Sequence, residues 1–223
     1  MNNLKVVQLN CHNAVQANIE LGILLTKYNG VIALLQEPYV NSRKIISNLP
    51  KGYDTFPGNK TDHKRTAIIA SKHLCLTEIN ELCTKTLTAV GGIIENKKLI
   101  FASIYMHYDK QVISDELKSL TSYCRTHNFQ LILGADSNSH SNLWGPEPKR
   151  KCKRGEELEE CILQEGFEVH NTGDIPTFEN KTCSSHIDIT LSFQLDLTIS
   201  GWTVSEDYNG SDHKTVADRS SEY

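Results

Sequence analysis

The segment Leu131–Ala135 is apolar throughout and runs directly into Asp136-Ser137-Asn138. Its length is typical of a buried strand, and residues i and i+2 of an extended backbone point to the same side. Asp136 and Asn138 are therefore predicted to leave the carboxyl end of this strand side by side. The pair combines a carboxylate that can act as a base with a neutral hydrogen-bonding partner.

Polar residues also punctuate apolar strands at four other points of the chain. They are Asn10, Glu37, Asp188 and the segment Ser211-Asp212-His213. A single Asp-x-Asn is more often a turn or a helix cap than a functional site. Five polar strand ends in one chain are harder to explain by turns alone, and they predict a site where several strand ends meet.

The apolar periodicity predicts three helices among many strands. The helices are predicted at 14–28, 111–127 and from about 155 to the glycine at 166, and the strands at 4–10, 31–36, 66–70, 75–79, 86–95, 98–106, 130–135, 167–171, 186–192 and 197–204. We expect 66–106 to form an antiparallel meander, and 40–64 to hold no regular element. This α/β order indicates a four-layer αββα sandwich, with two packed, mainly antiparallel sheets and the helices outside.

No interdomain linker interrupts the 223 residues, so we expect 1–223 to form one domain. The tail 214–223 lacks the apolar residues of a closing strand, and we expect it to be frayed or truncated. No apolar run is long enough to span a bilayer, and the chain starts with a strand instead of a signal peptide. Seven cysteines without a Cys-x-x-Cys pair favour free thiols in a reducing compartment. We therefore expect a soluble, intracellular protein that is not secreted and has no membrane partner.

The net charge of −4 argues against a protein held to nucleic acid by its overall charge. One local run of basic residues stands out shortly after the Asp136 strand end. It contains Lys149, Arg150, Lys151, Lys153 and Arg154. Two interpretations stay open for this run, contact with DNA phosphates and a nuclear-import signal.

One ordered set of motifs runs through nearly the whole chain. It consists of Asn10, Gln36-Glu37-Pro38, Tyr105, Asp136-x-Asn138 with Trp144-Gly145, Ile187-Asp188 and Ser211-Asp212-His213. A chain with these motifs in this order resembles the endonuclease/exonuclease/phosphatase superfamily. The resemblance implies a DNase-like fold and the cleavage of phosphate esters.

Further motifs narrow the resemblance. They are Leu143-Trp144-Gly145, Arg154-Gly155-Glu156-x-Leu158, Pro176-Thr177-Phe178 and Ser185-His186-Ile187-Asp188-Ile189-Thr190. With them the chain is similar to the endonuclease domains of insect-type non-LTR retrotransposons. That likeness implies an enzyme that nicks chromosomal double-stranded DNA, leaving a 3′ hydroxyl that primes reverse transcription. It also implies synthesis in the cytoplasm, action in the nucleus and a reverse transcriptase domain in the same polyprotein.

Phosphodiester cleavage needs an activated water and a means of neutralising charge on the transition state. Asp136 is predicted to orient or deprotonate the water, with Asn138 placing the phosphate or the aspartate. Asp188 and His213 are predicted to form a coupled pair that faces the phosphate, and Tyr105 to donate to a phosphate oxygen. The simpler interpretation is that Asp188 caps a turn and that Tyr105 is an ordinary strand aromatic.

Glu37, Asn10 and Asp212 offer the all-oxygen ligand set that Mg²⁺ prefers, with Mn²⁺ as the alternative ion. One departure from the pattern lies close by, because His12 stands where abasic-site repair enzymes of this superfamily carry an acid. Thr177 joins the basic run as a predicted DNA-binding residue. Trp144 is predicted to anchor the core or a loop.

The leading hypothesis is a Mg²⁺-dependent DNA endonuclease that is monomeric as an isolated domain. One alternative is a phosphatase or phosphodiesterase of the same superfamily, which would need a pocket for a phosphorylated headgroup. The other is a catalytically inactive DNA-binding module. The complete set of site residues speaks against the inactive module.

Overall fold

The computed structural model describes residues 4–42, 46–57, 65–109, 114–146 and 152–221. The first sheet contains, in spatial order, β13 (Thr198–Val204), β14 (Val216–Ser221), β1 (Leu4–Asn10), β2 (Val31–Gln36), β4 (Thr66–Ser71) and β3 (Tyr53–Phe56). The second contains β5 (Thr77–Glu78), β6 (Leu87–Ile94), β7 (Lys97–Tyr105), β8 (Gln130–Asp136), β12 (Asp188–Phe193) and β9 (Glu168–Val169). A separate hairpin joins β10 (Phe178–Glu179) to β11 (Ser184–Ser185).

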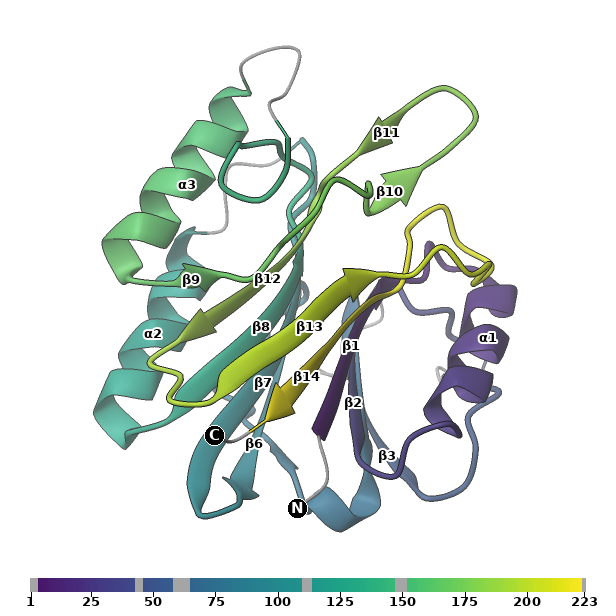
Figure 1. Cartoon of the computed structure of the whole chain (residues 1–223). Helices are drawn as coiled ribbons and strands as arrows, with labels where there is room; N and C mark the ends of the chain where they lie inside the picture. The colour runs from purple at the N-terminus through teal and green to yellow at the C-terminus, as the bar shows by residue number, and fades with distance from the viewer. Residues whose placement is uncertain (1–3, 43–45, 58–64, 110–113, 147–151, 222–223) are drawn as a thin grey trace.

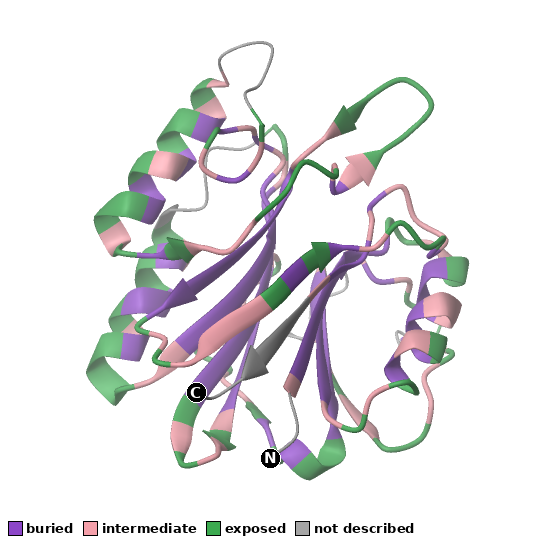
Figure 2. Cartoon of the chain, in the orientation of Figure 1, coloured by how far each residue is buried: buried purple, intermediate pink, exposed green. Residues whose placement is uncertain are grey.

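The three α-helices of the described residues cover the outer faces of the two sheets (Figure 1). Helix α1 (Val15–Leu25) packs on the first sheet, while α2 (Ser114–His127) and α3 (Lys153–Glu165) pack on the second. A short 3-10 turn, η1 (Lys72–Leu74), follows β4. Strands are mostly buried and helices are buried on one side only (Figure 2). The predicted four-layer αββα sandwich is confirmed, as is the mainly antiparallel pairing, since only β1–β2 and β7–β8 are parallel among the strand pairs of the described residues.

The alternation of side chains along β8 decides which residues face the other sheet. Leu131, Leu133 and Ala135 pack under the helices, whereas Ile132 packs against the first sheet. Gly134 and Asp136 share the face of Ile132, so they also point between the sheets. The inner face of this strand therefore changes from apolar to polar toward its carboxyl end, and Asp136 is its last residue.

Two buried glutamines tie the first sheet to β8 immediately before Asp136. The side-chain amide of Gln8 donates to the carbonyl of Ala135 at 3.0 Å, and that of Gln36 donates to the carbonyl of Gly134 at 3.2 Å. Gly134 makes this approach feasible, because a Cβ there would lie 2.9 Å from Oε1 of Gln8. The spacing of the two sheets is thus fixed next to the predicted site.

Two sequence predictions for residues 40–106 are wrong. Strand β4 lies in the first sheet, antiparallel to β2 and β3, so the described strands of the predicted meander at 66–106 that pair consecutively are reduced to β5, β6 and β7. Strand β3 also falls inside 40–64, where we expected no regular element. Its four residues have no buried side chain, so backbone hydrogen bonds to β4 create a strand that hydrophobic periodicity does not reveal.

The tail also differs from the prediction. Strand β14 lies between β1 and β13 and pairs with both in antiparallel fashion. Its register with β1 runs from Gln8 opposite Val216 to Leu4 opposite Ser220. Hydrogen bonding on two sides orders this segment although it is poor in apolar residues, so the expectation of a frayed tail is wrong for 216–221. In the described part of the chain, no helix is long and apolar enough to cross a membrane.

Candidate active site

The predicted site residues come from adjacent strand ends of both sheets. In the second sheet, Asp136 pairs with Tyr105 on one side and with Asp188 on the other. In the first sheet, Asn10 ends β1, and Gln36 opposite it ends β2. The side-chain amide of Asn10 crosses between the sheets and donates to Oδ2 of Asp136 at 2.7 Å. The strand ends therefore meet at one place, as their sequence pattern predicts.

Asp136 is held by two donors and is only 1% exposed. Besides Asn10, the backbone N–H of Asn138 donates to its Oδ1 at 3.2 Å. Asn138 has a φ of +46° and donates its own side-chain amide to the carbonyl of Met106 at 3.1 Å. Asn138 therefore contacts both the aspartate and the loop after β7, and its predicted role of placing the phosphate or the aspartate stays a prediction.

Asp188 and His213 form the predicted pair. Nδ1 of His213 lies 2.8 Å from Oδ2 of Asp188, and the side chains of His213 and Asp188 are 7% and 2% exposed, respectively. The Phe178 ring meets the imidazole edge-on at a centroid distance of 4.9 Å. Oδ1 of Asp188 has no hydrogen-bond partner among the described residues. A buried carboxylate with one unpaired oxygen suits a site that receives another ligand.

Burial and charge shift the pKa values of this cluster. Burial, followed by the neighbouring Asp188 carboxylate, raises the pKa of Asp136 to about 7, although His213 and Asn10 act in the opposite direction. Burial lowers the pKa of His213, but the charge and hydrogen bond of Asp188 outweigh it and raise that pKa to about 9. At neutral pH the cluster therefore combines a carboxyl group ready to exchange a proton with an imidazolium.

One oxygen or nitrogen atom from each of Asp136, Asp188 and His213 lies within 4.8 Å of the others. A group of this kind can bind a cation through its carboxylates or an anion through its imidazolium. Because Nδ1 of His213 is already paired with Asp188, Nε2 is the atom left for a ligand.

The predicted magnesium ligands lie around the same strand ends. The Glu37 carboxylate forms an ion pair with Arg65. Oδ1 of Asp212 lies 2.7 Å from Nδ1 of His12, and Oδ1 of Asn10 accepts the backbone N–H of His12 at 2.8 Å. Both carboxylates thus already face a basic side chain, and their oxygen donors fit a hard divalent cation. His12 is tied to Asp212 and adds a nitrogen donor at the position where the superfamily pattern has an acid.

Tyr105 lies at the end of β7 and is 7% exposed. The Arg65 guanidinium stands 5.4 Å from the centroid of its ring. Burial, followed by the negative charges of Glu37 and Asp136, raises the pKa of Tyr105 to about 12. The hydroxyl therefore keeps its proton at neutral pH and is able to donate a hydrogen bond, while donation to a phosphate oxygen stays a prediction.

Only part of the basic run predicted to bind DNA lies within the described residues. Lys149, Arg150 and Lys151 lie outside the described residues. Lys153 is exposed and stands 3.7 Å from Glu157 one helical turn later. Nε of Arg154 donates to the carbonyl of Ser137 at 3.2 Å, which places the end of the basic run beside the Asp136 loop.

Thr177, a predicted DNA-binding residue, lacks the exposure that a side-chain contact with DNA requires. Its side chain is fully buried, and its hydroxyl accepts the backbone N–H groups of Ile187 and Asp188 at 3.1 and 3.0 Å. This hydroxyl therefore fixes the start of β12, and thereby Asp188. Trp144 is 3% exposed and packs in the core while its indole N–H donates to Ser139, as expected of an anchor.

Sequence reasoning missed Arg65, which has no motif of its own.

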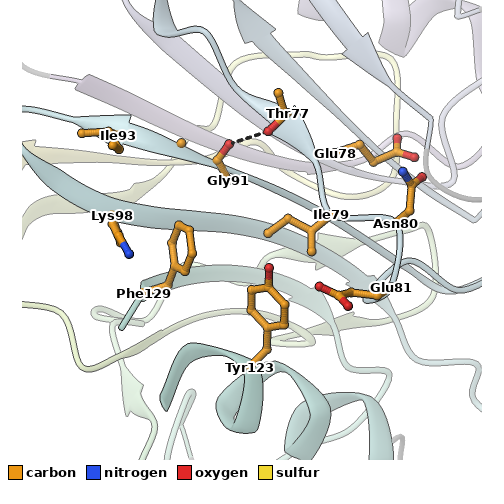
Figure 3. A pocket seen from close by; sticks show the side chains of 11 residues that line it. Thr77, Glu78, Ile79, Asn80, Glu81, Gly91, Ile93, Lys98, Tyr123 and Phe129 are labelled. Carbon is orange, nitrogen blue, oxygen red and sulfur yellow. Dashed lines mark hydrogen bonds between the residues drawn. The ribbon is translucent and has the colours of Figure 1, made fainter. Parts of the chain in front are cut away.

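A separate pocket of about 540 Å³ lies on another part of the surface, between β5, β6 and α2 (Figure 3). It is lined by Ile79, Tyr123 and Phe129 with acidic residues at its rim, and none of the predicted site residues lines it. The predicted catalytic residues therefore lie at the strand ends and not in this cavity.

Residues 99–217, more than half of the chain, match the Endonuclease-reverse transcriptase family. The chain belongs to this family. The matched region contains the buried cluster of Asp136, Asp188 and His213, together with Tyr105 beside it. The predicted likeness to non-LTR retrotransposon endonucleases within the endonuclease/exonuclease/phosphatase superfamily is confirmed.

Two relatives are each 28% identical to this member of the Endonuclease-reverse transcriptase family over the aligned residues. One is a 115 kDa protein of the type-1 retrotransposable element R1DM of Drosophila melanogaster, matched over 94% of this chain but only 21% of the relative. The other is the endonuclease domain of TRAS1, a telomere-specific non-LTR retrotransposon, with a TM-score of 0.82 over 97% of this chain and 98% of that chain. An AP endonuclease from Leishmania major shares the fold, with 11% identity, a TM-score of 0.71 and coverage of 99% and 88% of the two chains.

Proposed function

We propose that this chain is a metal-dependent endodeoxyribonuclease that nicks double-stranded DNA and leaves a 3′ hydroxyl. The observation that carries the proposal is the placement of Asp136 between Asn10, Tyr105 and the Asp188–His213 pair. A proton acceptor, neutral donors and a cationic donor then surround one point at the strand ends. Hydrolysis of a phosphodiester requires these three kinds of group.

In this mechanism Asp136 takes a proton from the attacking water. The water oxygen bonds to phosphorus and the bond from phosphorus to O3′ breaks, which leaves the phosphate on the 5′ terminus at the nick. O3′ takes a proton from a solvent water to become the 3′ hydroxyl. Asn10 orients Oδ2 of Asp136, and the N–H of Asn138 orients Oδ1. With a pKa near 7, Asp136 is able to accept a proton and release it in each turnover.

The charge that builds on the phosphate oxygens meets two donors. His213 carries a positive charge because Asp188 stabilises the imidazolium, and its Nε2 atom is left to donate. The protonated hydroxyl of Tyr105 donates as well. These interactions strengthen as the transition state gains charge, so they contribute mainly to the rate of the chemical step.

Glu37 and Asp212, with the amide oxygen of Asn10, would hold Mg²⁺ or Mn²⁺. When bound, the ion would supply positive charge that stabilises the phosphate oxygens and the leaving O3′. All three residues offer oxygen atoms near neighbouring strand ends, with Asn10 ending β1, Glu37 following β2 and Asp212 preceding β14, which supports this assignment.

The same proposal includes a biological setting. This chain spans about a fifth of the R1DM relative, so we propose that it works beside a reverse transcriptase domain of the same polyprotein. The nicked strand would then prime DNA synthesis on chromosomal DNA in the nucleus. We propose that the isolated domain is a monomer, which sedimentation of the purified chain would test.

The direct test is nicking of supercoiled plasmid with Mg²⁺, with Mn²⁺ and with EDTA. We expect open-circular product with either ion and none with EDTA, and the nicks should be extended by a DNA polymerase without prior treatment. Nicks that a polymerase extends only after removal of a 3′ phosphate would contradict the proposed bond cleavage. Release of phosphate from a small monoester without plasmid nicking would favour the phosphatase alternative.

A further inference from the structure

Arg65 joins two predicted site residues that belong to different sheets. Its guanidinium pairs with the Glu37 carboxylate at the end of β2 and stands 5.4 Å from the ring centroid of Tyr105 at the end of β7. Its carbonyl also accepts the N–H of Glu37 at 2.7 Å, because Arg65 and Glu37 extend the antiparallel pairing of β2 with β4 by one residue. Arg65 is therefore fixed at the site through its backbone, whatever its side chain does.

The side chain of Arg65 is 40% exposed, whereas that of Glu37 is 12% exposed, so the guanidinium is the more solvent-accessible member of the pair. Nη1 of Arg65 contacts Oε1 of Glu37, so a divalent cation bound to that oxygen would take the place of the guanidinium. Two cations that close to one carboxylate repel each other, so they compete for it.

A guanidinium released from Glu37 would remain beside Tyr105, whose hydroxyl is a predicted phosphate donor. Its planar fork of N–H groups suits the paired oxygens of a phosphodiester better than a point charge does. The Arg65 guanidinium would thus pair with Glu37 in the absence of metal and with a DNA phosphate when metal and DNA are present.

We propose that Arg65 binds a DNA phosphate at the cleavage site and, when no divalent cation is bound, neutralises Glu37 in its place. The inference rests on the proposed nuclease function and adds a phosphate-binding residue to it. It predicts that loss of the guanidinium strengthens metal binding and weakens nicking. If Arg65 had a purely structural role, its loss would weaken both metal binding and nicking.

The chain offers a matched control in Arg125. Its guanidinium stands 3.2 Å from Oε2 of Glu165 and 4.9 Å from the ring centroid of Phe193, with 48% and 16% exposure of the two paired side chains. Arg125→Gln therefore removes an ion pair and a ring contact of the same kind at α2 and α3, away from the site. The test variants are Arg65→Gln, which removes the charge, and Arg65→Lys, which keeps the charge without the fork.

The first measurement is Mn²⁺ binding to the DNA-free protein, followed by electron paramagnetic resonance. We expect Arg65→Gln to bind Mn²⁺ ~3-fold or more tightly than wild type because a competing charge is gone. The second measurement is the plasmid-nicking rate at saturating Mn²⁺. We expect a loss of ~10-fold or more in Arg65→Gln, a smaller loss in Arg65→Lys, and wild-type values for Arg125→Gln in both measurements.

Weaker Mn²⁺ binding by Arg65→Gln would overturn the competition, and an unchanged nicking rate would overturn the phosphate contact. Loss of the cooperative melting transition in both Arg65 variants would show a structural role and would also reject the inference. A wild-type protein that neither binds Mn²⁺ nor nicks DNA would instead reject the proposed function itself. The two failures are therefore distinguishable.

Discussion

Nδ1 of His213 lies 2.8 Å from Oδ2 of Asp188, and both side chains are more than nine-tenths buried. Two opposing effects act on the imidazole in this position. Burial disfavours the imidazolium, while the carboxylate favours it, and the carboxylate prevails. The charge that His213 brings to the site is therefore a property of the pair and not of histidine alone.

Replacing Asp188 with Asn should lower the pKa of His213 from about 9. Burial, which lowers this pKa, remains, while the charge and hydrogen bond of Asp188 are removed and only the weaker effects of Asp136 and Asp212 still raise it. Titration of the imidazole carbon-bound protons by NMR measures this directly. If the pKa stayed near 9 in Asp188→Asn, another group would have to be the source of the charge.

The same pair should behave as one unit in catalysis. We expect the double variant Asp188→Asn/His213→Ala to nick DNA little more slowly than His213→Ala alone, since Asp188 acts on the phosphate only through the imidazole. Single-turnover nicking rates of the four proteins complete the cycle. Strictly multiplicative losses would reject the coupling.

The nicking rate should follow a bell-shaped dependence on pH. It should rise through about pH 7, as Asp136 loses its proton and becomes the base, and fall through about pH 9, as His213 loses its charge. A cation bound near Asp136 favours the carboxylate, so a higher metal concentration should move the acidic limb to lower pH. The variant His213→Gln should retain the acidic limb and lose the alkaline one, and an alkaline limb that persists in it would contradict the assignment.

Close packing at Gly134 should be essential for the spacing of the sheets. A methyl group there would meet Oε1 of Gln8 at 2.9 Å, so we expect Gly134→Ala to lower the free energy of unfolding by about 1–3 kcal/mol. Gly30→Ala is the matched control, because its nearest contact would be His73 at 3.6 Å. Urea denaturation compares the two variants, and equal stabilities would refute the proposed crowding.

The basic run should contribute to DNA affinity through counterion release. Replacement of Lys149, Arg150, Lys151, Lys153 and Arg154 with Ser should reduce the slope of log affinity against log salt by about 0.9 for each phosphate that the protein no longer neutralises. Fluorescence anisotropy at several salt concentrations measures the slope. An unchanged slope would leave the import signal as the better interpretation of the run.

Much of the site was predictable because a strand alternates its side chains with a fixed period. The inner faces of β1, β2, β7 and β8 end in Asn10, Gln36, Tyr105 and Asp136, respectively, and polar residues at the ends of apolar strands are visible in a sequence. Their convergence follows once the strands lie in two facing sheets. The order of helices and strands predicted that arrangement and the resemblance to a known superfamily implied it too, whereas the alternation alone does not specify it.

Arg65 was missed because the sheet of one strand was assigned wrongly. Placed in a meander with β6 and β7, the segment 66–70 has no reason to meet Glu37. Paired with β2, it brings Arg65 opposite Glu37 through the register of Gln36 with Thr66. Strand pairing is decided by backbone hydrogen bonds and by packing between distant segments, and neither can be predicted from the local amino-acid composition.

Thr177 was misassigned for a different reason. Its family motif is visible in the sequence, but a hydroxyl that binds DNA and one that accepts backbone N–H groups look the same there. The structure distinguishes them, because the side chain is fully buried against the start of β12. The importance of Thr177 is thus for the position of Asp188.

The central claim is that Asp136 is the base of a metal-dependent nuclease, and Asp136→Asn tests it most directly. The substitution keeps the shape of the side chain and removes its ability to take a proton. With Mg²⁺ present, we predict a nicking rate at least about a hundredfold below wild type, with DNA affinity largely unchanged. A variant that nicks within roughly tenfold of wild type would contradict the account, since the loss of a general base costs more than that.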